Sequence, residues 1–280
     1  MNGRNHPPER PDLAWLKAKA KNLRRHMVAM AAGRGQGYLG QGLGMADILA
    51  ALYFHEMRTD RAEPHWLERD RFVLSTGHYS IALWAALAEL GVIPLAELST
   101  YGADRSRLDM STIDSTPGVE VIGGSLGHGL GQAVGMALGI RLDGLGARIF
   151  CELSDGELQE GSTWEAAIAA ASFKLDNLVA VIDCNGIQAD GRIVVDIEPI
   201  AEKWRAFGWA AQEIDGNDMA RIVEALERAR DSDGRPKAIV ARTLPGKGVP
   251  MLERREKAHF LNIGPDEAEA VKRELEASSD

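Results

Sequence analysis

Two apolar runs with polar turns at their ends constrain the fold of this 280-residue chain more than any other feature. The first run, Arg148 to Leu153, is followed by Asp155, and the second, Leu178 to Asp183, is followed by Asn185. The thirty positions from Asp155 to Asn185 suit a strand, a turn, a helix and a second strand, a crossover that is right-handed almost without exception. In a parallel sheet such a unit brings the two polar residues together at the carboxyl edge, where ligands of open α/β sheets bind.

The side chains expected at this edge carry oxygen ligands and point to a hard cation. Mg²⁺ prefers octahedral oxygen ligands and usually takes one or two carboxylates together with substrate phosphates. Gly156 lets a diphosphate approach the backbone, and the N-terminus of the following helix favours an anion. An Asp-Gly pair alone is a common turn, but Asp-Gly-Glu-Leu-Gln-Glu-Gly followed by Asp-x-Asn-Gly is a far more specific pattern.

Composition and charge exclude several classes of partner. The chain is 45% hydrophobic and has a net charge of −9, from 32 basic and 41 acidic residues without a basic block, so neither nucleic acid nor an anionic membrane is expected to bind. The uncharged run Val121 to Ile140 is long enough for a membrane helix, but its seven glycines favour a loop and a buried helix. We expect Cys151 and Cys184 to be buried free thiols in a reducing compartment, and the protein to be cytoplasmic.

The remaining apolar segments extend the alternation of strands and helices. We therefore expect an α/β fold with a doubly wound, mostly parallel sheet flanked by helices. A flexible lead (residues 1–12) would precede a single domain (residues 13–280), and a charged, solvated helix would begin at Pro265. The further predicted helices span residues 12–32, 45–56, 78–90 and 219–230, and the further predicted strands span residues 70–75, 209–214 and 237–242.

Glycine-rich stretches and one histidine mark the other candidate positions. The glycine-rich segment 33–44 precedes an apolar helix, which suggests a wall built close to a ligand rather than a simple linker. His78 leaves the strand 70–75 and would share the ligand edge with Asp155, unless it only packs locally. Glycines at 127, 131, 135 and 139 lie four apart, and each costs about 0.8–1 kcal/mol relative to alanine in a helix. We take them as a site of tight helix packing, with contact to a partner subunit as a hypothesis.

Taken together, these motifs resemble the thiamine-diphosphate motif, and transketolases in particular. The resemblance implies the thiamine diphosphate-binding fold, with thiamine diphosphate and Mg²⁺ as cofactors. The Mg²⁺ would be held by the side chains of Asp155 and Asn185 and by the backbone carbonyl of Ile187. Ser154 departs from the family's usual glycine. The likeness runs from Leu13 to about Asn262, and its anchors are GMADILAALYF, DRFVLSTGH, TPGVEVIGGSLGHGL, SDGELQEG, NGIQADG and KGVPMLERREKAH.

The resemblance also implies roles for individual residues. His78 would lie at the diphosphate and the reaction centre, and His259 would assist proton transfer near the thiazolium and the substrate. Glu160 and Glu165 match acids of an interface network that links cofactor sites, although acids are also favoured at a helix N-terminus. The residues that would contact the cofactor by backbone or packing are Gly124, Leu126 and Gly156.

A partner chain is a further implication of the resemblance. Transketolases normally continue with a pyrimidine-binding domain and a C-terminal domain, and the glutamate that activates the aminopyrimidine lies outside the diphosphate-binding half. We therefore expect the N-terminal subunit of a split transketolase, which transfers a two-carbon ketol unit between sugar phosphates. It would be active only in a heteromer with a C-terminal subunit, in the form of an α2β2 heterotetramer.

Two departures from the family bear on the substrate. Tyr38 and Met110 occupy positions where ordinary transketolases carry sugar-contacting histidines. Tyr38 keeps a hydroxyl group but does not take up a proton near neutral pH, and Met110 offers neither. We therefore expect a donor other than the standard pentose phosphates.

Three alternatives stay open from the sequence. The chain could belong to an enzyme like 1-deoxy-D-xylulose-5-phosphate synthase, which shares the metal turn but usually lacks the ELQEG continuation. It could be like the alpha chain of a 2-oxo acid dehydrogenase, which generally lacks the DRFVLSTGH anchor. It could also be a non-catalytic regulatory paralogue, although the set Asp155, Asn185, His78 and His259 would then have no chemical purpose.

Overall fold

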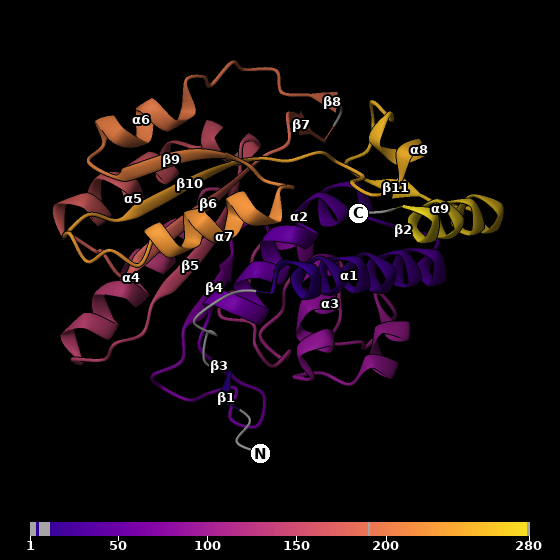
Figure 1. The fold of residues 1–280 in the computed structure, drawn as a ribbon, viewed down its shortest axis with the longest axis horizontal. Coiled ribbons are helices and arrows are strands. Elements are labelled where there is room, and N and C mark those ends of the chain that lie inside the picture. Colours follow the sequence, from indigo (N-terminus) through magenta and orange to yellow (C-terminus); the bar gives the residue numbers. More distant parts are fainter. Residues whose placement is uncertain (1–3, 6–11, 190, 279–280) are drawn as a thin grey trace.

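A five-stranded parallel sheet forms the centre of the computed structural model, which describes residues 4–5, 12–189 and 191–278 (Figure 1). The strand order is β4-β5-β6-β10-β9, and every neighbouring pair is parallel. This confirms the predicted α/β fold. The strands are β4 (Arg71–Leu74), β5 (Ile149–Ser154), β6 (Leu178–Cys184), β9 (Ala210–Asp215) and β10 (Lys237–Arg242).

Helices cover both faces of the sheet, so β5 and β6 are buried throughout, whereas the edge strand β9 is partly exposed. Phe150 belongs to the buried cluster that includes residues of α1, α2, α3 and α7, whereas its neighbour Cys151 belongs to the cluster on the opposite face, which includes residues of α4, α5 and α6. This alternation explains why the strands read as continuous apolar runs. The helices are α1 (Leu13–Arg34), α2 (Leu39–Ala51), α3 (Ser80–Leu90), α4 (Gly129–Leu142), α5 (Gly161–Ser172), α6 (Ile200–Ala206), α7 (Met219–Arg228), α8 (Pro250–Glu253) and α9 (Pro265–Ala277).

Short antiparallel pairs and single helical turns complete the described chain. β1 pairs with β3, β2 with β11, and β7 with β8. These strands are β1 (Arg4–Asn5), β2 (Gln36–Gly37), β3 (Thr59–Asp60), β7 (Ile187–Gln188), β8 (Gly191–Arg192) and β11 (Leu261–Asn262). The short helices are η1 (Leu52–Glu56, a π-helix) and the 3₁₀ turns η2 (Gly77–Tyr79), η3 (Leu95–Thr100) and η4 (Gly156–Gln159).

The start of α1 and the end of α3 follow local sequence signals, whereas the start of α2 does not. The Asp12 side chain caps α1 by accepting a hydrogen bond from the Trp15 N–H at 3.0 Å. Gly91 ends α3 in the left-handed region with φ +85°, as a C-terminal glycine should. The helix that was predicted to begin at Met45 is α2. Its predicted start was wrong, because α2 begins at Leu39 and includes three glycines of the glycine-rich segment. α6 was not predicted either.

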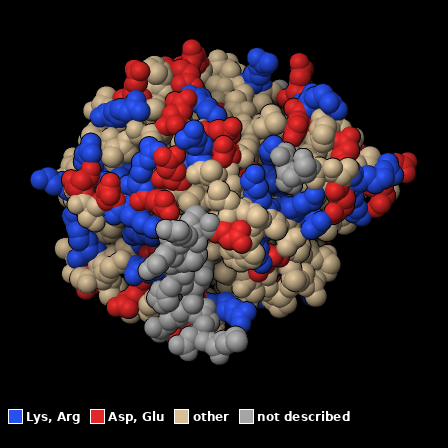
Figure 2. All heavy atoms as spheres, in the orientation of Figure 1, with Lys and Arg blue, Asp and Glu red and all other residues tan. Residues whose placement is uncertain are grey.

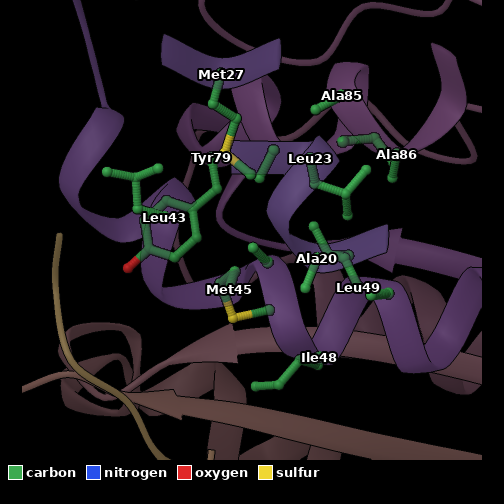
Figure 3. Packing of buried hydrophobic residues seen from close by; sticks show 14 of the residues in the cluster. Ala20, Leu23, Met27, Leu43, Met45, Ile48, Leu49, Tyr79, Ala85 and Ala86 are labelled. Atoms are coloured by element: carbon green, nitrogen blue, oxygen red, sulfur yellow. The ribbon is translucent and has the colours of Figure 1, made fainter. Parts of the chain in front are cut away.

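Close packing explains why glycines lie inside α2. A Cβ added to Gly40 would lie 2.2 Å from the carbonyl oxygen of Ala258, and one added to Gly44 would lie 3.1 Å from that of Leu244. Tertiary packing therefore overrides the low helix propensity of glycine. Figure 3 shows how alanine, leucine, isoleucine and methionine side chains of α1, α2 and α3 pack together with the ring of Tyr79. Within the same layer Arg24 of α1 forms a buried ion pair with Asp47 of α2.

The evenly spaced glycines at positions 127, 131, 135 and 139 do not pack in the expected way. Gly127 precedes α4, while Gly131, Gly135 and Gly139 lie on it with no heavy atom within 4 Å of an added Cβ. The predicted close approach of another backbone to these three glycines is therefore wrong among the described residues. Contact with a partner subunit stays a prediction.

Further expectations from the sequence concern the two cysteines, the helices, the surface charges and the N-terminal segment. Cys151 and Cys184 are free and buried, as predicted. Across the described residues, no helix is both long and apolar enough to cross a bilayer. Basic and acidic side chains are interspersed on the face shown in Figure 2, and α9 buries Ala268, Val271 and Leu275, so it is only partly solvated. Residues 1–3 and 6–11 of the predicted lead lie outside the described chain, and the division at residue 12 stays a prediction.

Substituting two glycines should have opposite effects on stability. A Cβ on Gly77 would lie 2.3 Å from a backbone atom of Gly123, so Gly77→Ala should lower the free energy of unfolding by about 1–3 kcal/mol. Gly135→Ala is the matched control, because its Cβ meets open space and should raise the helix stability by about 0.8–1 kcal/mol. Urea denaturation of both variants measures this, and equal stability of the two would contradict the packing described.

Candidate functional site

The turns after β5 and β6 meet at the carboxyl edge of the sheet. Ser154 pairs with Asp183 in the parallel register, and the Asp155 N–H donates to the Asp183 carbonyl at 3.0 Å. The Asp155 carboxylate then accepts hydrogen bonds from the N–H groups of Gly156 at 2.8 Å and Gly186 at 2.7 Å. The structure therefore brings the acid of the first turn against the backbone beside Asn185, as the strand–helix–strand unit predicts.

The carboxamide of Asn185 is fixed by three partners. Its Nδ2 donates to the Asp183 carboxylate at 2.7 Å and to the Tyr79 hydroxyl oxygen at 2.9 Å. Its Oδ1 accepts from the Ile187 N–H at 3.0 Å, and an oxygen of this kind has a second lone pair available for another partner. Asp155 and Asn185 both line one open cavity beside the sheet edge.

The charges of the neighbouring carboxylates of Asp155 and Asp183 suit a cation. Burial, together with the neighbouring Asp183 carboxylate, raises the pKa of Asp155 to about 7, and burial raises the pKa of Asp183 to about 6. No described Lys or Arg forms an ion pair with either carboxylate, so a bound cation would offset the cost of burying their charge. The donors are carboxylate and amide oxygens, which Mg²⁺ prefers.

The number of protein ligands is small. Among the described residues no three His, Cys, Asp or Glu side chains lie close enough together to hold a metal ion. A site with one carboxylate and neutral oxygens leaves coordination positions for the oxygens of a bound phosphate, which is the usual arrangement for Mg²⁺. The residues present therefore fit a Mg²⁺–diphosphate ligand better than a metal held by protein alone.

Two buried glutamates hold the surrounding turns together. Glu157 accepts hydrogen bonds from the Ser75 hydroxyl and from the Gly127 N–H, the latter at 2.7 Å. Glu152 accepts from the Thr76 N–H at 3.3 Å and from its hydroxyl at 2.6 Å. Both carboxyl groups are fully buried, and burial raises the pKa of each. Sequence reasoning did not assign either acid, because only the fold shows which backbone groups they meet.

A cluster of tyrosine, histidine and phenylalanine rings lies near Asp155 and Asp183, the acids at the ends of β5 and β6. The His78 ring centroid is 4.8 Å from that of Tyr38 and 5.2 Å from that of His259, and the Tyr38 ring also contacts His259 at 5.3 Å and Phe260 at 4.9 Å. Burial and the neighbouring His259 lower the pKa of His78 to about 3, so the imidazole is neutral near pH 7. These rings come from the start of α2, the turn η2 and the segment before β11.

Tyr79 connects the two groups of residues. Its ring lies 4.8 Å from His78, and its hydroxyl oxygen accepts the hydrogen bond from Asn185. The metal-binding candidates and the candidate acid–base histidines therefore belong to one site. Tyr79 was not singled out from the sequence, because an aromatic residue beside His78 reads as core.

The other predicted positions are distributed around this site. Gly124, with φ +120°, follows Gly123, which packs directly on Gly77 beside His78. Met110 is near Gln36, with the amide nitrogen 3.9 Å from its sulfur. Glu160 and Glu165 are exposed in this chain, and their place in an interface network stays a prediction. Leu126 is half-buried, and Asp190 of the NGIQADG motif lies outside the described residues.

Comparison with known proteins gives the family. Residues 17–279 match the family described as transketolase, thiamine diphosphate binding domain. A transketolase family protein of Sinorhizobium fredii is 51% identical over 262 residues, covering 92% of this chain and 94% of the relative. The 6-deoxy-6-sulfo-D-fructose transketolase subunit of a Clostridium species is 39% identical, covering 93% and 96%. An apulose-4-phosphate transketolase subunit of Actinobacillus succinogenes is 38% identical, covering 93% and 95%.

A solved structure supports the same conclusion. The transketolase of Campylobacter jejuni superposes with a TM-score of 0.87 at 32% identity, covering 93% of this chain and 42% of its own. This chain thus spans about two fifths of that transketolase, whereas it spans nearly all of the subunits named above. The resemblance drawn from the sequence is confirmed: this chain belongs to the transketolase family, whose thiamine diphosphate-binding domain it carries.

Proposed function

We propose that this chain is the thiamine diphosphate-binding subunit of a two-chain transketolase, which transfers a two-carbon ketol unit between sugars. Two relatives of nearly the same length are named as transketolase subunits, which supports an enzyme assembled from separate chains. The observation that carries the proposal is the continuous set of contacts from Asp155 through Gly186 and Asn185 to Tyr79 and His78. A cytoplasmic location stays a prediction.

The chain's own residues would perform distinct tasks in this reaction. Thiamine diphosphate, when bound, supplies the nucleophilic carbon that allows a carbon–carbon bond of the ketose to break. The side-chain oxygens of Asp155 and Asn185 and the carbonyl of Ile187 would hold Mg²⁺ with the diphosphate. His78 is neutral and therefore offers the diphosphate and the reacting atoms a hydrogen-bond donor without a full charge. His259 would move a proton at the substrate.

A second polypeptide would complete the site. The pyrimidine-binding domain of the family is not among the residues matched here, and we propose that a C-terminal subunit provides it in an α2β2 assembly. Exposed apolar side chains flank the carboxyl edge: Val194 is 80% and Ile122 60% exposed. Val194 lines the same cavity as Asp155, so a partner that covers this edge would also close the site. Glu160 and Glu165 would join the network between paired sites.

The substrate proposal rests on Tyr38 and Met110. Tyr38 contacts both candidate histidines with its ring, so its side chain belongs to the candidate sugar site. We propose a donor other than the standard pentose phosphates, because neither Tyr38 nor Met110 reproduces a sugar-binding histidine. Relatives named for sulfofructose and apulose 4-phosphate support such a donor.

Removing the metal-binding carboxylate tests the cofactor site. In the two-chain assembly, Asp155→Asn should weaken Mg²⁺-dependent binding of thiamine diphosphate by at least about tenfold, because it removes the anionic oxygen ligand. Isothermal titration calorimetry in excess Mg²⁺ measures this affinity. Asp215→Asn, at the end of the edge strand β9, is the control and should bind as the wild type does. Unchanged affinity of the Asp155 variant would contradict the assignment.

Steady-state kinetics test the activity and the donor. The chain mixed with a separately expressed C-terminal transketolase subunit should transfer a ketol unit, whereas each chain alone should be inactive. Xylulose 5-phosphate should not be the best donor, and Tyr38→His should improve its kcat/KM, because it restores a sugar-contacting histidine. Tyr38→Phe removes the hydroxyl group but keeps the ring, so it distinguishes the contributions of the two to kcat/KM. The substrate proposal fails if xylulose 5-phosphate is the preferred donor of the wild-type pair.

A further inference from the structure

A buried glutamine holds one of the candidate catalytic histidines. Gln41 lies in the first turn of α2 and is only 1% exposed. Its side-chain amide nitrogen donates a hydrogen bond to Nδ1 of His259. The two residues are 218 positions apart in the sequence, so no local pattern predicts the contact.

The backbone around this contact is held firmly in place. Gly37 pairs with Leu261 in the antiparallel β2–β11 ladder. The carbonyl of Ala258 is so close to Gly40 that a Cβ there would lie 2.2 Å from it. The Gly40 carbonyl in turn accepts a hydrogen bond from the Gly246 N–H at 2.8 Å. The approach of Gln41 to His259 is therefore fixed by main chain on both sides.

The other end of the same amide shows that Gln41 is not simply a core residue. Its Oε1 is buried and has no hydrogen-bond partner within the described part of the chain. Leaving a buried polar atom unpaired lowers the stability of the folded state, a penalty that an apolar side chain of similar size would avoid. The hydrogen bond to His259 is the interaction that a glutamine makes here and a leucine would not.

We propose that Gln41 is a positioning residue for His259: its amide donates to Nδ1 and thereby holds the imidazole as the Nε2–H tautomer. An imidazole nitrogen that accepts a hydrogen bond carries no proton in the neutral ring, so the proton is at the other nitrogen. His259 then presents a hydrogen-bond donor to a ligand. The titratable neighbours around its ring include His78 and Tyr38. The nature of the ligand that this donor would contact rests on the proposed function, whereas the tautomer itself does not.

Nuclear magnetic resonance of the histidine side chains tests the tautomer without any assay of activity. In the two-chain assembly with ¹⁵N-labelled histidine in this chain, the wild type should show Nε2–H at His259. Gln41→Leu should give a mixture of tautomers, because the donor is lost. Gln41→Glu can only accept, so it should shift the proton to Nδ1 and raise the pKa of His259 by about one unit or more.

Internal controls separate this effect from misfolding. His26, whose Nε2 lies 2.9 Å from Glu89 on another part of the fold, should give the same signals in all variants. Gln132→Leu changes an exposed glutamine on α4 and should leave His259 unaltered. An Nδ1–H tautomer in the wild type, or the same tautomer and pKa in Gln41→Leu with His26 unchanged, would overturn the inference.

Kinetics provide the second readout. Gln41→Leu should lower kcat of the two-chain enzyme by about ten- to a hundredfold through misplacement of His259, while the Kd of thiamine diphosphate stays the same. An unchanged kcat would overturn the positioning role. If the wild-type pair shows no ketol transfer at all, the proposed function fails, and the tautomer measurement still decides the role of Gln41.

Discussion

The hydrogen bond from the Gly186 backbone to the Asp155 carboxylate is the contact on which the rest of the site depends. It joins the turn after β5 to the turn after β6, and the parallel register of these strands makes it possible. Asn185, directly before Gly186, then turns its amide towards Asp183 and Tyr79. The Asp155 carboxylate is held by backbone N–H groups and forms no ion pair with a described side chain, so a bound cation would offset the cost of burying its charge.

Acids deeper in the fold hold the segments of this edge in place. Glu157 connects the η4 turn to Ser75 and Gly127, and Glu152 connects β5 to Thr76. Three segments distant in the sequence are thereby fixed relative to one another before any ligand arrives. Much of the ordering needed for a site of this kind takes place during folding rather than during binding, which favours affinity.

The sequence predicted those features that depend on local patterns. The apolar runs located β5 and β6 and hence Asp155 and Asn185, and the strand-to-turn position of His78 placed it at the same edge. Glycines misled the prediction in two places. Gly40 is helical because Ala258 packs against it, and the glycines of α4 lie open although their spacing indicated a tight contact. Both outcomes depend on what lies opposite, which a single sequence does not contain.

The contact between Gly40 and the Ala258 carbonyl also limits how this family member could change. Since the two main chains leave no room for any side chain at position 40, the backbone beside the candidate sugar site cannot move there without separating α2 from the segment that carries His259. Tyr38 and Gln41, close to this position in the sequence, both contact His259 through their side chains. Under the proposed function, an exchange at position 38 would fit a different sugar without moving the backbone that holds this histidine.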